Sequence, residues 1–242
     1  MCGRYTITVT LEELMEMFDA EDATGDGLLL PRFNIAPTQP GPAIISHGGH
    51  NRMGQLRWGL IPSWAKDEKI GFQTINAKAE TVQDKPAFRM SFQKKRCLIP
   101  ADGYYEWQTQ DKTKQPYRIV LKDRPVFAFA GLYDTWVSPD GKKISTYTII
   151  TTTANALTEK LHPRMPVILP REQQQNWLDS TASPAALMSL LVPYESSRMD
   201  LYPIAPTVGN VRNEGPELIR PYQPNEEEKK TDPAPIQLTL DL

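Results

Sequence analysis

The first periodic pattern in the chain predicts a helix. Apolar residues recur every three or four positions in the stretch TLEELMEMF, so that one face is apolar; they are Leu11, Leu14, Met15 and Phe18. Thr10 and Glu13 have the spacing of a capping box, in which each side chain bonds the backbone N–H of the other residue. The sequence therefore predicts a capped helix within residues 10–18, ended by the polar stretch AEDATGDG.

Strand-like patterns fill the middle of the chain. Five segments show apolar alternation or many β-branched residues; they are AIIS at 43–46, RCLIP at 96–100, YRIVL at 117–121, VFAFAG at 126–131 and TYTIIT at 146–151. HGGHN and SPDGKK are typical of hairpin turns, and helical patterns return in REQQQNWL and PAALMSLLV. Because the strands cluster without regular helices between them, we predict an α+β fold with a mixed, mainly antiparallel, barrel-like sheet and peripheral helices.

The 242-residue chain is long enough to bury a substantial core as a single domain. We expect a folded body over 1–222 and a flexible polar tail over 223–242. The net charge of −2 argues against a surface that is covered with basic side chains for binding nucleic acid. Without the two bases and five acids of the tail, however, 25 basic and 24 acidic residues remain. A local basic groove is therefore still open.

The cysteine count and the hydropathy of the sequence indicate the cellular compartment in which the protein is expected. Cys2 and Cys97 are the only cysteines, so a disulfide framework is not expected and a reducing cytoplasm is the natural location. No apolar run approaches the roughly 20 residues that span a bilayer, and the start lacks the pattern of a secretory signal. We therefore expect a cytoplasmic protein.

Cys2 directly follows the initiator methionine. A small residue at this position permits removal of Met1, which leaves a free α-amine beside a thiol. Their unperturbed pKa values of about 8 and 8.5 give both groups a reactive fraction near neutrality. An aldehyde would form an imine with the amine, and the thiol would then close a five-membered thiazolidine ring. Such intramolecular closure has an effective molarity of roughly 10⁵ M or more.

Other interpretations remain open from the residues alone. Cys2 is a small buried hydrophobe in the first of them. In the second, the segment MCG begins an N-terminal-nucleophile amidohydrolase or thiol peptidase, such as a glutamine amidotransferase, whose thiol attacks an amide while the amine acts as base. A non-catalytic module that binds single-stranded DNA is the third.

Seven segments considered together resemble one family. They are MCGRYT, RFNIAP, RWGLIPSWAKD, INAKAET, PADGYYEW, LHPRMPVIL and VGNVRNEGPELI. In this combination and order they resemble the SRAP family, the SOS response-associated peptidases or abasic-site processing proteins, from the start of the chain to about Ile219. The resemblance implies that Cys2 captures the aldehyde of an abasic site in single-stranded DNA as a thiazolidine.

The resemblance also implies that Asn76, Glu106 and His162 act around the abasic sugar. Glu106, which lies between two aromatic residues, is a candidate to move a proton between the ring oxygen and the amine, with a pKa raised by partial burial. His162 can donate or accept a proton near neutral pH, and the amide of Asn76 can orient a sugar hydroxyl. Taken alone, each of the three also fits an ordinary structural position.

Five further residues are candidates to hold the DNA strand. They are Arg4, Lys78 and Arg164 for the phosphates, and Pro37 and Trp64 for the bases beside the lesion. Lys78 stands where the family more often has arginine, so the charge is kept but the bidentate geometry is lost. Trp58 could join this stacking surface, but core packing is a more natural interpretation for Trp58 than for Trp64.

A thiazolidine would protect the strand in a way that an imine would not. An imine at C1′ acidifies the C2′ proton and leads to strand cleavage by β-elimination, whereas the tetrahedral carbon of the ring removes this route. We therefore expect an enzyme with lyase-like chemistry that shields abasic sites during replication. We also expect this enzyme to be a monomer associated with the nucleoid. No cofactor or metal is expected, because the cysteines and histidines lack ligand spacing. General proteolysis is not expected.

The last six residues, QLTLDL, follow a charged spacer. The four residues that carry the pattern resemble the peptide by which bacterial proteins dock on the sliding β clamp; they are Gln237, Leu238, Leu240 and Leu242. The leucines would fill an apolar groove, and a disordered spacer would supply reach. A terminal strand packed on the body and a tail without function are the alternatives.

Overall fold

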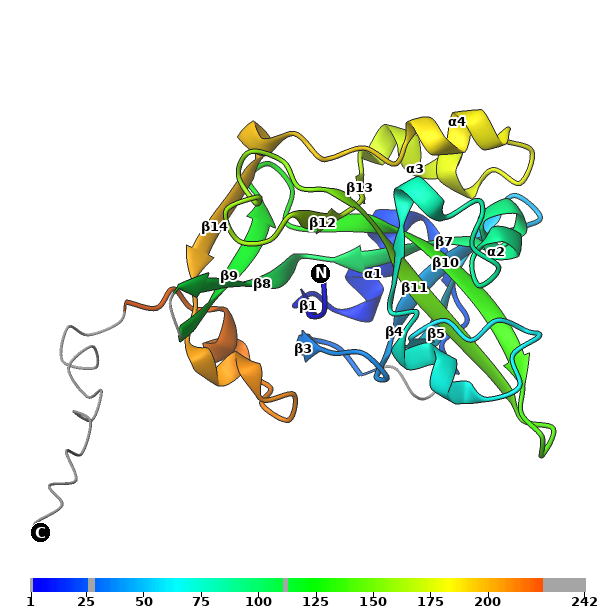
Figure 1. The fold of residues 1–242 in the computed structure, drawn as a ribbon, viewed down its shortest axis with the longest axis horizontal. Helices are drawn as coiled ribbons and strands as arrows, with labels where there is room; N and C mark the ends of the chain where they lie inside the picture. The colour runs from blue at the N-terminus through cyan, green and yellow to red at the C-terminus, as the bar shows by residue number, and fades with distance from the viewer. Residues whose placement is uncertain (1, 26–28, 111–112, 224–242) are drawn as a thin grey trace, which may run out of the picture.

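A computed structural model describes residues 2–25, 29–110 and 113–223. In this part of the chain the strands form two sheets (Figure 1). The smaller sheet has the order β14–β9–β8–β1–β3, and all its neighbouring strands are antiparallel. Its strands are β1 (Tyr5–Ile7), β3 (Arg32–Ile35), β8 (Gly103–Gln110), β9 (Thr113–Leu121) and β14 (Met199–Pro203).

The larger sheet closes into a barrel. Its main path is β12–β11–β10–β7–β4–β5–β2, with β13 paired to β10 and β6 paired to β11. Because β5 also pairs with β11, in parallel, the strands β11, β10, β7, β4 and β5 form a closed ring. The strands of this sheet are β2 (Ala20–Asp22), β4 (Pro40–His47), β5 (His50–Trp58), β6 (Asn76–Lys78), β7 (Arg96–Ala101), β10 (Phe127–Val137), β11 (Lys143–Thr153), β12 (Arg164–Pro166) and β13 (Ile168–Leu169). The α+β fold with a mainly antiparallel, barrel-like sheet is thus confirmed.

Short helices cover the outside of the sheets. They are α1 (Leu11–Phe18), α2 (Arg89–Lys94), α3 (Arg171–Leu178) and α4 (Pro184–Ser189), with single turns of 3₁₀ helix at η2 (Glu68–Phe72), η3 (Ala79–Thr81), η4 (Ser196–Arg198), η5 (Pro206–Gly209) and η6 (Pro216–Ile219). In Figure 1, α3 and α4 lie together at the top of the view, and the orange segment that contains η5 and η6 lies beside the smaller sheet. None of the helices in the described ranges is long and apolar enough to cross a membrane.

The capping box and the hairpin turns form as predicted. The backbone N–H of Thr10 donates to Glu13 Oε2 at 2.8 Å, and the N–H of Glu13 donates to Thr10 Oγ1 at 3.2 Å. Gly48 and Gly49 form the two-residue turn between β4 and β5 with φ of 61° and 85°. Two positive φ angles in succession match the right-handed twist of the paired strands, and glycine adopts them without strain.

One helix is shorter than its apolar pattern. The run PAALMSLLV extends to Val192, but α4 ends at Ser189. Pro193 disfavours helical geometry at the residue before it and cannot donate a backbone hydrogen bond, so the helix stops within one turn of the proline.

Aromatic side chains fill the space between β1 and the barrel. The ring of Tyr5 meets Trp58 edge-on at 5.3 Å, and Trp58 stacks on Tyr147 at 6.0 Å. The hydroxyls of Tyr5 and Tyr147 share a hydrogen bond of 2.7 Å. Gly41 lies against this pair, and a Cβ at that position would stand 2.3 Å from Tyr5 Oη. The absence of a side chain at Gly41 therefore lets the two tyrosines meet.

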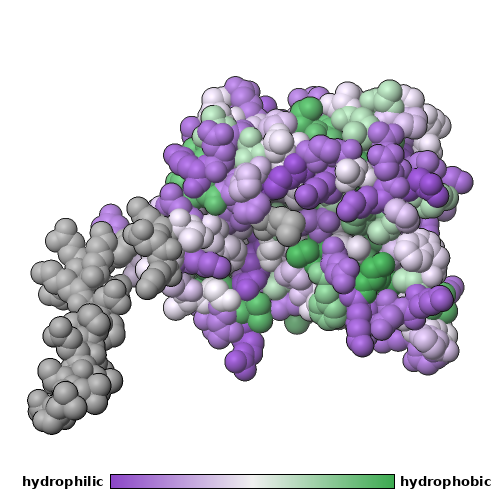
Figure 2. All heavy atoms as spheres, in the orientation of Figure 1, coloured by the Kyte–Doolittle hydropathy of each residue, from purple (hydrophilic) through white to green (hydrophobic). Residues whose placement is uncertain are grey.

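The surface in Figure 2 is mainly hydrophilic, with apolar residues in small separate patches. Large apolar side chains that are exposed include Leu29, Trp64, Phe72 and Met90. Scattered apolar residues of this kind are ordinary on a soluble surface.

We predict that Gly41→Ala destabilises the protein by about 1–3 kcal/mol, the usual range for overpacking a core. The added methyl group would displace the hydroxyls of Tyr5 and Tyr147. Urea unfolding measures the effect. Gly209→Ala is the matched control, because a Cβ there meets no atom within 4 Å. Equal stabilities of the two variants would contradict the prediction.

Candidate functional site

Strand pairing places Cys2 beside Glu106. β1 pairs with β8 through Tyr5↔Tyr104, and the N–H of Tyr105 donates to the carbonyl of Arg4 at 3.0 Å. The residues before β1 therefore continue along β8 towards Glu106. The electrostatic effect of Glu106 on the Cys2 thiol agrees with this proximity.

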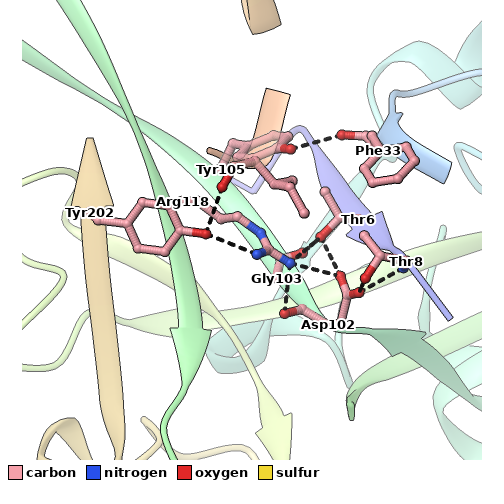
Figure 3. A network of polar contacts seen from close by, with 9 residues as sticks. Thr6, Thr8, Phe33, Asp102, Gly103, Tyr105, Arg118 and Tyr202 are labelled. Atoms are coloured by element: carbon pink, nitrogen blue, oxygen red, sulfur yellow. Dashed lines mark hydrogen bonds and ion pairs between the residues drawn. The ribbon is translucent and has the colours of Figure 1, made fainter. Parts of the chain in front are cut away.

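A buried carboxylate holds β1 in place. Asp102 accepts the hydroxyl of Thr6 at 2.5 Å and the backbone N–H of Thr8 at 2.6 Å, and it also accepts the hydroxyl of Thr8. The Arg118 guanidinium forms an ion pair with Asp102 at 3.1 Å and donates to the Tyr202 hydroxyl at 2.9 Å. Figure 3 shows this network between β1, β8, β9 and β14. It fixes the strand whose upstream end carries Cys2.

Arg4 ties the same strand to the carboxyl-terminal part of the domain. Its guanidinium donates to Asn34 Oδ1 at 2.7 Å and to the carbonyls of Val208 at 2.8 Å and Gly209 at 3.1 Å. Asn34 in turn donates to the carbonyls of Val208, Asn210 and Asn213. Arg4, expected to contact a phosphate, thus makes three hydrogen bonds within the protein, and a phosphate would have to share the group.

Burial tunes the carboxyl of Glu106. The residue is only 4% exposed, and burial raises its pKa to about 7. Near neutral pH the group is therefore present both as acid and as base, the condition under which one carboxyl can donate and accept a proton in the same reaction. This agrees with the raised pKa expected from its aromatic neighbours.

Burial acts on the Cys2 thiol in the same sense. The side chain is fully buried. Burial, and after it the negative charge of Glu106, raise the pKa of the thiol above its ordinary value, against a smaller stabilising effect of the Arg4 backbone N–H. The sulfur is therefore a thiol near neutral pH and needs a base to react.

Asn76 lies in β6 and His162 lies just before β12, and these two strands pair with β11 on its two sides. Asn76 in β6 pairs with Ile149, while β12 follows His162 and pairs with the end of β11. Asn76 Nδ2 donates to the Ile75 carbonyl at 2.9 Å. Its Oδ1 is buried and has no hydrogen-bond partner among the described residues, so it is available as an acceptor.

The ring of His162 has a defined orientation. The backbone N–H of Arg164 lies 3.0 Å from Nδ1 and can only donate to it, whereas the Arg164 carbonyl is farther away at 3.2 Å. A neutral imidazole that accepts at Nδ1 carries its proton on Nε2. Burial lowers the pKa of His162, so this neutral form prevails near pH 7.

The contact between β1 and β11 joins the two groups of residues. The hydrogen bond between the Tyr5 and Tyr147 hydroxyls lies three residues after Cys2 and two residues before Ile149, the partner of Asn76. The structure thus brings Cys2 and Glu106 together. Asn76 and His162 lie next to β11, the strand that Tyr5 contacts through Tyr147.

Arg164 and Lys78 share an acidic neighbour that the sequence did not single out. Glu80 forms a bidentate ion pair with Arg164 at 2.6 and 2.9 Å, and Arg164 also donates to the Thr151 carbonyl at 2.6 Å. The hydrogen bonds from Arg164 lower the pKa of Glu80, with a smaller contribution from the charge of Lys78. Glu80 lies two residues after Lys78 in INAKAET, but nothing in that spacing points to Arg164.

The remaining candidate residues differ in how far their side chains are exposed to solvent. Trp64 is 57% exposed and available to a ligand, whereas Trp58 is 1% exposed and donates to the Ile75 carbonyl, as expected for a core residue. Pro37 is partly buried. In the described ranges no three His, Cys, Asp or Glu side chains gather as metal ligands would. The four clamp-peptide candidates, Gln237, Leu238, Leu240 and Leu242, lie outside the described residues.

Comparison with known proteins gives one consistent family. Residues 1–211 match the model of the family described as SOS response associated peptidase (SRAP). The chain is 48% identical to the abasic site processing protein YoqW of Bacillus subtilis, over 92% of this chain and all of that protein. It is 31% identical to the abasic site processing protein HMCES of Gallus gallus, over 92% of this chain and 78% of that protein. A crystal structure of a Bacteroides thetaiotaomicron protein superposes with a TM-score of 0.85 at 30% identity, covering 92% of this chain and all of that one.

We predict that Glu106 makes stability depend on pH between about 4.5 and 7. Its pKa rises from an ordinary 4.5 to about 7 on folding. The folded state therefore holds the proton more tightly, and the stabilisation present below pH 4.5 is lost as the pH rises through 7. The loss is on the order of 3 kcal/mol relative to Glu106→Gln, which cannot titrate. Urea unfolding of both proteins across this pH range measures it, and parallel curves would contradict it.

Proposed function

The chain belongs to the SOS response associated peptidase (SRAP) family, and from this membership and the geometry of Cys2 we propose that it processes abasic sites in single-stranded DNA by capturing them covalently. Relatives at up to 48% identity are named abasic site processing proteins. The observation that carries the proposal is the buried Glu106 carboxyl, whose pKa of about 7 suits proton transfer, beside the buried Cys2 thiol.

The capture takes place in two steps. Once Met1 has been removed, the Cys2 amine attacks the sugar aldehyde and water leaves, which gives an imine at C1′. The Cys2 sulfur then adds to C1′, and the thiol proton ends on the nitrogen of the new ring. Because both nucleophiles belong to one residue, the second step is intramolecular and favoured by proximity.

Glu106 is proposed to carry the protons in both steps. As a carboxylic acid it protonates the ring oxygen of the closed sugar, which opens to the aldehyde as the C1′ hydroxyl gives its proton to water. In the imine step the same acid protonates the hydroxyl that leaves as water. As a carboxylate it accepts the thiol proton. A pKa of about 7 lets one group perform both tasks at neutral pH.

His162 and Asn76 are proposed to hold the sugar. The Nε2–H of neutral His162 is a donor for a sugar oxygen. The buried Oδ1 of Asn76, which lacks a partner within the described ranges, is an acceptor for a sugar hydroxyl. A donor and an acceptor on one side of the sugar would orient C1′ towards Cys2.

We propose that the DNA strand is held by contacts that ignore base sequence. Lys78 and Arg164 supply positive charge for the phosphates, and Arg4 contributes through its remaining N–H capacity. The exposed ring of Trp64, with Pro37, supplies an apolar surface for bases beside the lesion. When a phosphate binds, Arg164 would give up part of its bidentate ion pair with Glu80.

Intact-mass measurement tests the capture. Incubation with a single-stranded abasic oligonucleotide should give a denaturant-stable adduct equal in mass to the protein without Met1 plus the oligonucleotide, minus one water. Cys2→Ala keeps the amine but cannot close the ring, so it should give no thiazolidine and more strand cleavage. Equal adduct formation by Cys2→Ala, or full activity of protein that retains Met1, would refute the proposal.

We also propose that the tail docks on the bacterial sliding clamp through Gln237, Leu238, Leu240 and Leu242. The support is that apolar residues reappear after a charged spacer, where a purely solvated tail would have none. A variant that ends at Asn225 should lose clamp binding in a pull-down or by surface plasmon resonance, and it should form the DNA adduct at the full rate. Clamp binding that survives the deletion would contradict the docking.

A further inference from the structure

The hydroxyl of Tyr104 lies in the protein core. The residue is 0% exposed, and its Oη has no hydrogen-bond partner in the part of the chain that the structure describes. The ring itself is well packed and meets Phe129 edge-on at 6.0 Å. A buried hydroxyl without a partner destabilises the folded state, and phenylalanine in the same space would avoid this cost. The hydroxyl therefore calls for an explanation outside packing.

The strand register places Tyr104 on the same face of β8 as Glu106, the carboxyl that lies beside Cys2, because residues two apart on a strand share a face. Its Cα is paired with that of Tyr5, three residues after Cys2. Burial raises the pKa of Tyr104 well above its ordinary value, and the negative charges of Cys2 and Glu106 add to the effect. The hydroxyl thus stays protonated, as a donor, close to both groups.

The Cys2 thiol needs such a donor. To close the ring it must give up its proton inside the protein, where burial and the charge of Glu106 both oppose a thiolate. A cation would stabilise the thiolate, but it would also lower the pKa of Glu106, which could then no longer act as an acid near neutral pH. A neutral O–H that donates to sulfur stabilises the charge without this side effect.

We propose that the Tyr104 hydroxyl donates a hydrogen bond to the Cys2 sulfur as the thiol ionises and attacks C1′, which makes Tyr104 a further catalytic residue. This rests on the proposed covalent capture. In the step, the carbon–nitrogen double bond of the imine becomes single and the sulfur–C1′ bond forms. The thiol proton passes to Glu106 and then to the ring nitrogen. Tyr104 keeps its own proton throughout, so the step needs no other reactant.

Tyr104→Phe tests the proposal because it removes the oxygen and keeps the ring. We expect the single-turnover rate of thiazolidine formation to fall about 10- to 100-fold, the range for losing a hydrogen bond to a charged acceptor. The limb of the pH–rate profile that reports thiol ionisation should move to higher pH. The free energy of unfolding should stay equal or rise, since an unpaired buried hydroxyl is gone.

A matched control and a second measurement separate chemistry from packing. Tyr105 is on the opposite face of β8, and its hydroxyl donates to the Phe33 carbonyl at 2.8 Å. Tyr105→Phe should lower stability and leave the rate unchanged. Reduction by borohydride traps the imine, which forms before the Cys2 sulfur reacts, so Tyr104→Phe should form the trapped imine at the wild-type rate.

The outcomes are distinct. An unchanged thiazolidine rate in Tyr104→Phe overturns the role of Tyr104 and leaves the covalent capture standing. Equal slowing of the imine and of the thiazolidine overturns it as well, because a general disturbance of the site then explains both. Absence of any adduct with the wild-type protein overturns the proposed capture itself.

Discussion

The carboxylate of Asp102 is the point on which the site depends. It receives hydrogen bonds from Thr6 in β1 and from Thr8 just after this strand, and it forms an ion pair with Arg118 in β9. A short strand of three residues near a chain end would ordinarily fray. Here a buried charge that is satisfied on several sides holds it, and removing one partner would leave the other uncompensated. The position of Cys2 relative to β8 follows from this attachment.

Exclusion of water gives the site its chemical character. Burial moves the pKa values of Cys2, Glu106 and Tyr104 upward, so that all three favour their protonated forms. A protonated thiol does not react unselectively, and a carboxyl that titrates near neutrality can activate it when a substrate is present.

Local patterns in the sequence predicted the local structure correctly. The capping box of α1, the Gly48–Gly49 turn and the apolar runs of β7 and β10 all depend on neighbours in the chain, and each was predicted. The barrel-like sheet was also expected, but its closure was not, because the parallel pairing of β5 with β11 joins residues about 90 positions apart. Periodicity carries no information on such contacts.

For the candidate site, too, the sequence predicted some features, and only the fold shows the others. The residue types at Cys2, Glu106 and His162 suggested chemistry, and family resemblance singled out their positions. The partners of the basic candidates Arg4 and Arg164 could not be predicted, because only the fold brings Glu80 to Arg164 and Asn34 to Arg4. Tyr104 was passed over, since an aromatic residue in a strand is ordinary until its hydroxyl is found without a partner.

The bonds from Arg4 and Asn34 to residues 208–213 also bear on the order of events during synthesis. The acceptors for these side chains are among the last parts of the domain to leave the ribosome, whereas the amino end leaves first. The first strand must therefore wait for its final contacts while most of the polypeptide is made. During that interval the amino-terminal end is accessible to an aminopeptidase, and Cys2 becomes enclosed only when translation of the domain is complete.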